Sequence, residues 1–186
     1  RMAQGVPPGK VDESIVRRLW WAALETVQED ILLPIEPSRG LWLAAPLPAL
    51  YEPRLLKYLR GWVWAPEEIE NLHSRQSSLL PPSRAWPIQG TNNDSMAGCY
   101  TRLPLREEDG DDPLLLILTP EVQIVLALQG EQGKRNLLMR SDPDTLSDLL
   151  HMLDLRLNQE KPFQARELRQ ALADLGQLES NSQVEK

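Results

Sequence analysis

The sequence predicts an α/β (α+β) fold, with a mixed or antiparallel central sheet and flanking helices. Three observations predict it. Helical and strand-like runs alternate over the first third of the chain, short strand-like runs separated by turn residues follow, and a leucine-striped helical segment comes near the end. The chain has 186 residues, 41% of them hydrophobic and 25% charged, which suffices for one core of moderate size. We therefore expect one domain with tails.

The first element is an amphipathic helix over residues 12–31. Apolar residues recur there every three or four positions, and Asp12 stands where a side chain caps the first turn. Pro34 and Pro37 end the helix, because proline cannot continue it. The predicted apolar stripe consists of Ile15, Val16, Leu19, Trp20, Ala23, Leu24, Val27 and Ile31.

Strands and short helices follow in alternation. Residues 41–45 form an apolar run that suits a buried strand, and residues 62–64 form a second one. Between them, Pro53 is placed as the first-turn proline of a short helix. Pro66 has the same placement and predicts another helix, which ends by Pro81. The opening order is therefore helix, strand, helix, strand.

The middle of the chain is predicted to form an antiparallel sheet. Residues 114–119 and 122–128 are separated by only two residues, a connection too short for a crossover helix, so they form a hairpin. Further strand-like runs are residues 85–88, 98–103 and 137–140. The loop before the hairpin is strongly acidic, and we interpret it as a solvated turn because like charges repel. Its acidic residues are Glu107, Glu108, Asp109, Asp111 and Asp112.

Two helices are predicted at the C-terminal end. Asp142 and Pro143 supply a cap and a first-turn proline, and leucines keep helical spacing after them. Beyond Pro162, a second helix carries a narrow apolar stripe at coiled-coil spacing. Such a stripe needs a partner, so it either folds back on its own chain or pairs two chains as a dimer and signalling helix. Its residues are Ala165, Leu168, Leu172 and Leu175.

These patterns divide the chain into four parts. We expect a disordered N-terminus over residues 1–11, an α/β domain over 12–160, a C-terminal linker helix over 161–179 and a polar tail over 180–186. The first ten residues lack the apolar core of a secretory signal, and no run of about 18 apolar residues is present. The expectation is a cytoplasmic protein without a membrane span.

Composition and motifs exclude several kinds of function. A net charge of -7, with basic residues scattered singly or in pairs, argues against a nucleic-acid partner. A single cysteine, Cys99, cannot form an intrachain disulfide or a zinc cluster. Gly130 and Gly133 lack the features of a phosphate-binding loop, and His73 and His151 are interpreted as ordinary helix-surface residues. No metal site, catalytic residue or cofactor is identifiable.

The six tryptophans are the most unusual feature of the composition, because one phenylalanine and three tyrosines accompany them. Trp20, Trp42 and Trp64 all lie on predicted apolar faces. Tryptophan packs in cores, and it also lines ligand pockets and interfaces. Both interpretations stay open, and these three are the candidate ligand-binding residues.

The second half of the chain resembles a family of sensory modules. Leu103-Pro104-Leu105, the hairpin at 112–128, the strand at 137–140 and the helix start Ser141-Asp142-Pro143 carry the resemblance. They are similar to the DICT and GAF-like input domains that precede histidine kinase or diguanylate cyclase output domains in bacterial, notably cyanobacterial, signalling proteins. The shared pattern is a hairpin followed by a helix cap, over roughly the last half of the chain.

The resemblance implies a GAF-like sensor whose C-terminal helix passes a signal to an output domain. Its partners would be a second copy or an output kinase domain, with a small molecule as ligand. Cys99 lacks a neighbourhood that matches a chromophore anchor, so no covalent bilin is implied.

Three functions follow from these patterns. The first is a non-catalytic sensory input domain of a two-component signalling protein. The second is a stand-alone protein-docking or assembly adaptor, which the acidic surface and the tryptophan content favour. The third is an enzyme whose catalytic groups converge from distant positions.

Overall fold

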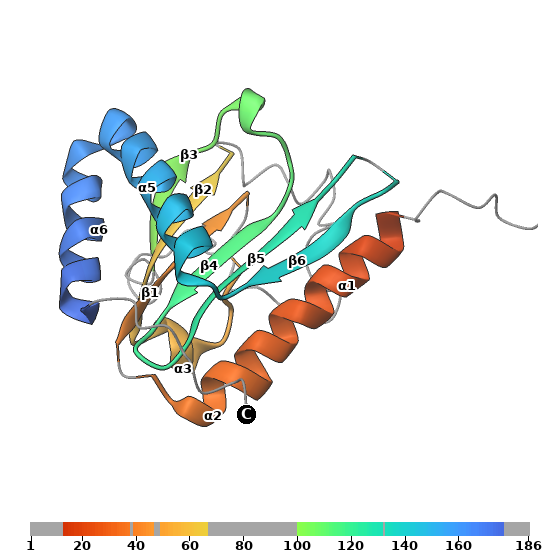
Figure 1. Ribbon diagram of the computed structural model, residues 1–186, viewed down its shortest axis with the longest axis horizontal. Helices are drawn as coiled ribbons and strands as arrows, with labels where there is room; N and C mark the ends of the chain where they lie inside the picture. The colour runs from red at the N-terminus through yellow and green to blue at the C-terminus, as the bar shows by residue number, and fades with distance from the viewer. Residues whose placement is uncertain (1–12, 38, 47–48, 67–99, 132, 177–186) are drawn as a thin grey trace, which may run out of the picture.

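In the computed structural model, the described residues form a six-stranded sheet with helices on both faces (Figure 1). They are residues 13–37, 39–46, 49–66, 100–131 and 133–176. The strands are β1 (Gly40–Ala45), β2 (Leu59–Ala65), β3 (Tyr100–Pro104), β4 (Leu114–Leu118), β5 (Gln123–Gln129) and β6 (Asn136–Arg140). Their order across the sheet is β3-β2-β1-β4-β5-β6. The predicted α+β fold with a mixed sheet and flanking helices is confirmed.

The sheet has a parallel half and an antiparallel half. β1 pairs in parallel with β2, and β2 with β3, whereas β1, β4, β5 and β6 pair antiparallel in succession. The predicted hairpin of β4 and β5 is confirmed, with Leu116 opposite Val125. The prediction of an antiparallel sheet is wrong for β3. This strand follows β2 after a long connection, and a long connection allows the chain to return for parallel pairing.

The first helix is longer and less regular than predicted. α1 (Glu13–Thr26) continues as the π-helical segment η1 (Val27–Leu32) and the short α2 (Leu33–Ile35). Gln28, in η1, is completely buried, and its side-chain Oε1 accepts hydrogen bonds from the backbone N–H groups of Tyr51 and Glu52 at 2.9 and 3.1 Å. These two residues lead into α3 (Pro53–Leu56). Gln28 therefore fastens the start of α3 to the first helix.

The C-terminal helices begin where the sequence predicts. α5 (Pro143–Glu160) is followed by α6 (Pro162–Leu175), and a short 3-10 turn, η3 (Glu107–Asp109), lies in the acidic loop. The Asp142 carboxylate caps α5 by accepting a hydrogen bond from Thr145 N–H at 3.0 Å, which lowers the pKa of Asp142. α5 and α6 pack together on the sheet, so the boundary predicted at residue 160 separates two helices of one packed layer.

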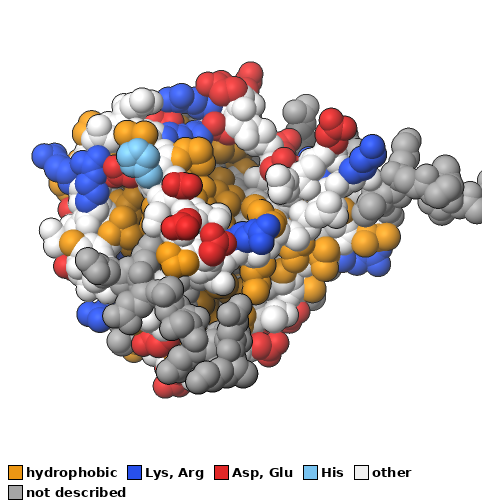
Figure 2. All heavy atoms as spheres, viewed as in Figure 1, with side chains coloured by type: hydrophobic (Ala, Val, Ile, Leu, Met, Phe, Trp, Pro, Cys, Tyr) orange, Lys and Arg blue, Asp and Glu red, His pale blue; other side chains and the backbone are white. Residues whose placement is uncertain are grey.

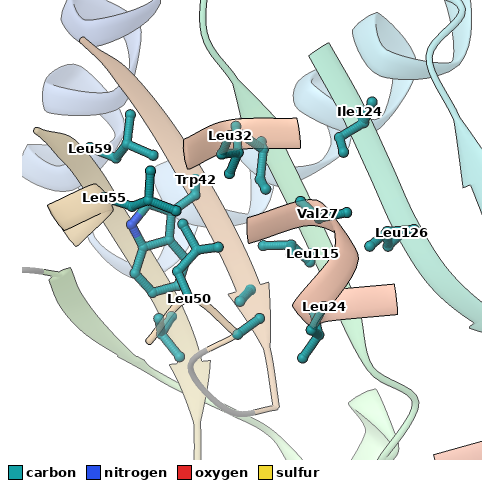
Figure 3. Close-up of a cluster of buried hydrophobic side chains, with 14 of the residues drawn as sticks. Leu24, Val27, Leu32, Trp42, Leu50, Leu55, Leu59, Leu115, Ile124 and Leu126 are labelled. Carbon is teal, nitrogen blue, oxygen red and sulfur yellow. The ribbon is translucent and has the colours of Figure 1, made fainter. Parts of the chain in front are cut away.

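The core has two layers, one on each face of the sheet. Side chains alternate along each strand, so neighbouring residues enter opposite layers. On one face, α1, η1 and α3 cover apolar residues of β1, β2, β4 and β5 (Figure 3). On the other face, α5 and α6 cover the alternate residues. The result is a three-layer arrangement of helices, sheet and helices.

Several sequence predictions fall outside the described residues. These are the disordered N-terminus over residues 1–11, the cap at Asp12, the helix after Pro66, the strand at 85–88, His73, Cys99 and the polar tail at 180–186. Within the described ranges, no helix combines the length and the apolar character needed to cross a membrane.

Candidate functional site

The three candidate tryptophans lie on opposite sides of the sheet. Trp20 of α1 and Trp42 of β1 belong to the layer under α1, whereas Trp64 of β2 belongs to the layer under α5 and α6. Their exposed fractions are 3%, 0% and 3%. The sheet separates Trp64 from the other two, so the three side chains do not share one site. All three are packed in the core, the first of the two interpretations, and a ligand-binding role stays a prediction.

Trp42 is fitted over a glycine of the neighbouring strand. Gly61 lies opposite Trp42 in the parallel pair, and a Cβ atom at Gly61 would lie 2.4 Å from Trp42 Cε2. Tyr100 of β3 meets the same indole edge-on, with ring centroids 5.8 Å apart. Within the described part of the chain, Trp42 Nε1 is buried without a hydrogen-bond partner. The absence of a side chain at Gly61 is therefore what gives the indole its space.

Two further indoles connect β2 to the C-terminal helices. Trp62 Nε1 donates a hydrogen bond to Gln164 Oε1 at 3.1 Å, and Trp64 Nε1 donates to Glu160 Oε2 at 3.2 Å. Both acceptors lie at the junction between α5 and α6. A buried indole N–H group usually has such a partner. The two bonds therefore hold the junction of α5 and α6 over β2.

Two arginines lie over these indole rings. The Arg60 guanidinium is 5.2 Å from the centroid of Trp62, and the Arg156 guanidinium is 5.8 Å from that of Trp64. Both distances fall within the range of cation–π attraction. Arg60 also pairs with Glu167 of α6 at 2.9 Å. On this face of β2, each of the two indole rings is thus in contact with an arginine side chain.

Arg156 belongs to a four-membered charge network. It contacts both carboxylate oxygens of Asp109, at 2.6 Å for the Nη1–Oδ1 pair, and its Nε lies 3.2 Å from Glu160 Oε1. Glu160, whose side chain is 6% exposed, also pairs with Arg106 at 3.1 Å. Two cations and two carboxylates satisfy one another. The network therefore holds the loop at Arg106 against α5, which is a structural role.

The acidic loop is thus less solvated than predicted. Asp109 lies in the charge network with a side chain 17% exposed, and Asp112 pairs with Arg135 at 2.9 Å. Glu108, by contrast, is 74% exposed and lies 4.0 Å from Arg106. The interpretation as a solvated turn is wrong for Asp109, because Arg156 reaches it from a helix 47 residues away in the sequence.

The charge network predicts a specific acid response. The hydrogen bond from Arg156 lowers the pKa of Asp109 below its usual 3.8. A carboxylate with a lowered pKa stabilises the fold above its unfolded-state pKa, and this stabilisation is lost as the pH falls through the folded-state pKa. We expect Asp109→Asn to be less stable than the wild type at about pH 6 and to approach it near pH 3 in urea unfolding.

Glu108→Gln is the matched control for this prediction. It removes a carboxylate from the same loop, but one that is exposed, so its effect on stability should be small at both pH values. An Asp109→Asn difference that is as large near pH 3 as at pH 6 would show that the ion pair is not its source.

The stripe of the last helix folds back on its own chain. Ala165 and Leu168 are fully buried in the layer between α6, α5 and the sheet, and Leu172 and Leu175 are half-buried against it. Ala165 and Leu168 are therefore not available for a dimer contact, because residues of β1, β2 and α5 already cover their side chains. A signalling role of the helix stays a prediction. In the structure α6 is a core helix and not a linker.

Hydrogen bonds and ion pairs hold the start of α1 beside β6. Glu13 Oε1 accepts a hydrogen bond from the backbone N–H of Gly133 at 3.1 Å, and Glu13 Oε2 lies 3.6 Å from Arg135. Both partners lie within the three residues before β6. From this point α1 runs alongside β6 (Figure 1).

The surface along α1 and β6 is apolar. Ile15 and Leu19 of α1 are 53% and 47% exposed, and Met139 of β6 is 56% exposed. Met139 lies opposite Leu126, a residue of the layer under α1, so it is on the same face of the sheet as that helix. Figure 2 shows hydrophobic side chains gathered along these two elements. We call Ile15, Leu19 and Met139 the α1–β6 surface.

Comparison with known proteins identifies a family. The sequence pattern of a domain of unknown function, DUF8628, matches residues 1–186. The chain belongs to the DUF8628 family. No curated protein and no solved structure matches it. The resemblance to GAF-like and DICT sensory domains therefore stays a prediction.

Three further observations concern the titratable side chains in the described part of this DUF8628 chain. No three His, Cys, Asp or Glu side chains are grouped there as a metal site would require. His151 is exposed on α5, which confirms its interpretation as a helix-surface residue. The described carboxylates of the charge network are all engaged with arginine.

Sequence reasoning missed the exposure of the α1–β6 surface. Ile15 and Leu19 were assigned to the buried stripe, yet the structure buries Val16, Trp20 and Leu24 and leaves those two half-exposed. The spacing gave no signal of this exposure, because eight apolar positions in twenty residues are no more than a single buried helix face normally carries.

Proposed function

We propose that this chain is a non-catalytic protein-docking module that binds its partner through the α1–β6 surface. One observation carries the proposal: half-exposed Ile15, Leu19 and Met139 lie beside a strand edge to which no other described strand is paired. Apolar side chains that gather at one place mark interaction surfaces more often than scattered ones do.

The free edge of β6 supports the proposal independently. An open edge offers a row of unpaired N–H and C=O groups to a further strand, and proteins commonly block such edges with charge or proline. The three central residues of β6 are Leu137, Leu138 and Met139, so this part of the strand contains no charged side chain and no proline. The edge therefore remains competent for pairing.

The sensory input function remains a second proposal that rests on the sequence resemblance. A cytoplasmic location, a place in a two-component system and a cyanobacterial source belong to it. The sheet separates its three candidate tryptophans, with Trp64 on the opposite face from the other two. Its candidate helix residues Ala165 and Leu168 are covered by other parts of the same chain. The docking function has the better support, because its surface is exposed.

Site-specific photo-crosslinking in living cells tests the docking function. A photoreactive amino acid at Met139 is compared with the same amino acid at Met152, which is 59% exposed on α5 and lies outside the proposed surface. We expect discrete crosslinked products from position 139 and none above background from position 152. Equal products from both positions, or none from position 139, would contradict the proposed function.

A further inference from the structure

We infer that the partner at β6 is a second copy of this chain, whose β6 pairs antiparallel with the first to join the two sheets. The inference rests on the proposed docking function and names its partner. The sequence predicted a homodimer contact at α6, but the apolar stripe of α6 is covered by its own chain. The inference places the homodimer contact at the open edge of the sheet instead.

The hydrogen-bond pattern of the hairpin determines which groups of β6 face outward. Leu128 N–H donates to Pro113 O, and Thr119 N–H donates to Val122 O, so the even-numbered residues of β5 bond toward β4. The odd-numbered residues of β5 therefore bond toward β6, where Ala127 lies opposite Leu138. By the same alternation, Leu137 and Met139 direct their backbone N–H and C=O groups to the free edge.

Symmetry then restricts the register. A two-fold axis that joins two such edges antiparallel is perpendicular to the sheet, so the α1 faces of both copies lie on the same side of the joined sheet. An odd-numbered residue of β6 therefore lies opposite an odd-numbered residue of the second copy, and an even-numbered residue lies opposite an even-numbered one. With the axis at Leu138, all five residues of β6 pair with strand residues. Leu137 and Met139 of each copy then form hydrogen-bonded pairs with Met139 and Leu137 of the other, and the two Leu138 residues form a non-hydrogen-bonded pair.

The side chains are self-complementary in this register. On the α1 face, Leu137 meets Met139 of the second copy, and on the other face Leu138 meets itself beside the half-buried Ala127. Beyond the strand ends, Lys134 comes opposite Asp142, a pairing of opposite charges that occurs twice. A register centred on Leu137 would instead place Arg140 opposite Lys134. The charges therefore favour the axis at Leu138 over one at Leu137.

The helices add to the same contact. Because the axis preserves the faces of the sheet, both α1 helices lie on one side of the joined sheet, antiparallel and flanking the axis. The exposed Ile15 and Leu19 of each copy are then on the side of the second copy. A partner that added only an extended strand would leave these two residues uncovered.

Disulfide trapping tests the pairing and its register. In a Cys99→Ser background, Leu138→Cys places two thiols in a non-hydrogen-bonded pair with Cα atoms about 4.5 Å apart, within the range of a disulfide. Arg140→Cys is the matched control, because its two Cα atoms would be offset by four residues, about 14 Å. We expect a covalent dimer from Leu138→Cys under mild oxidation and none from Arg140→Cys. Comparable dimer from both variants, or none from Leu138→Cys, would overturn the inference.

Sedimentation equilibrium of the full chain supplies a second test. The wild type is expected at twice the chain mass of 21.2 kDa, and Met139→Pro at 21.2 kDa. Proline there removes an outward N–H and leaves the β5–β6 ladder intact, so circular dichroism should be unchanged. A monomeric wild type would overturn the inference. If position 139 still crosslinks to a different protein, the docking function survives while the second copy is excluded.

Discussion

Replacement of Gly61 by alanine is expected to destabilise the protein by about 3 kcal/mol or more, at the upper end of the cost of overpacking a core. The new Cβ would lie 2.4 Å from Trp42 Cε2, and the Trp42 indole is completely buried between β2, Tyr100 and the residues of α3. It therefore cannot yield without displacing other core side chains. Thermal unfolding should show a melting temperature lower by about 6–12 °C for a chain of this size.

Two further variants assign this effect to the indole. Gly110→Ala is the control for the loss of a glycine without a clash, because a Cβ there meets nothing within 4 Å. Its cost is that of a backbone conformation, φ 72° and ψ -173°, that is almost confined to glycine, about 1–3 kcal/mol. Trp42→Phe shortens the ring system, so the double variant Gly61→Ala/Trp42→Phe should be more stable than the sum of the single effects predicts. Strict additivity would show that the clash with Trp42 is not the cause.

Replacement of Leu168 by aspartate is expected to unfold most of the chain rather than to separate a dimer. Leu168 is fully buried between α6, α5 and the sheet. The change removes a large apolar side chain and buries an unpaired carboxylate, which together cost about 5 kcal/mol or more. This approaches the total stability of an ordinary domain, about 5–15 kcal/mol. Circular dichroism should show loss of helix and strand signal without denaturant.

Phe163→Asp is the matched control on the same helix. Phe163 is 61% exposed and lies two residues before Ala165, the first residue of the stripe, so the same introduced charge remains in water and the fold should persist. A folded, monomeric Leu168→Asp would contradict the burial of α6 and revive its role as a dimer helix. A folded Phe163→Asp together with an unfolded Leu168→Asp would confirm the position of the stripe in the core.

Local sequence patterns predicted helices and strands well where the residues at a position favour a single kind of local structure. Asp142 and Pro143 marked the start of α5 because a capping carboxylate and a fixed φ both suit the first helical turn. The hairpin of β4 and β5 followed from a connection too short for anything else. The first helix was predicted in place, but its π-helical end was not. The side chain of Gln28 in that segment accepts hydrogen bonds from Tyr51 and Glu52, and local spacing does not reveal a contact with so distant a segment.

The candidate sites were predicted less well, because their residue types have several uses. Trp20, Trp42 and Trp64 suit a core as well as a pocket, and only strand pairing revealed that the sheet divides them. The spacing of Arg156 and Glu160 allowed an ion pair within one helix, but nothing in the sequence placed Asp109 beside them.

The sequence by itself determined the class of fold, the positions of the described strands and main helices, and the acidic composition that argues against a nucleic-acid partner. These depend on local periodicity, capping and charge, which each short segment carries within itself. The tertiary structure decided the parallel pairing of β3, the burial of α6, the separation of the tryptophans and the exposure of the α1–β6 surface. Each of these depends on which distant segments compete for the same apolar face, and that competition is settled only when the whole sheet assembles.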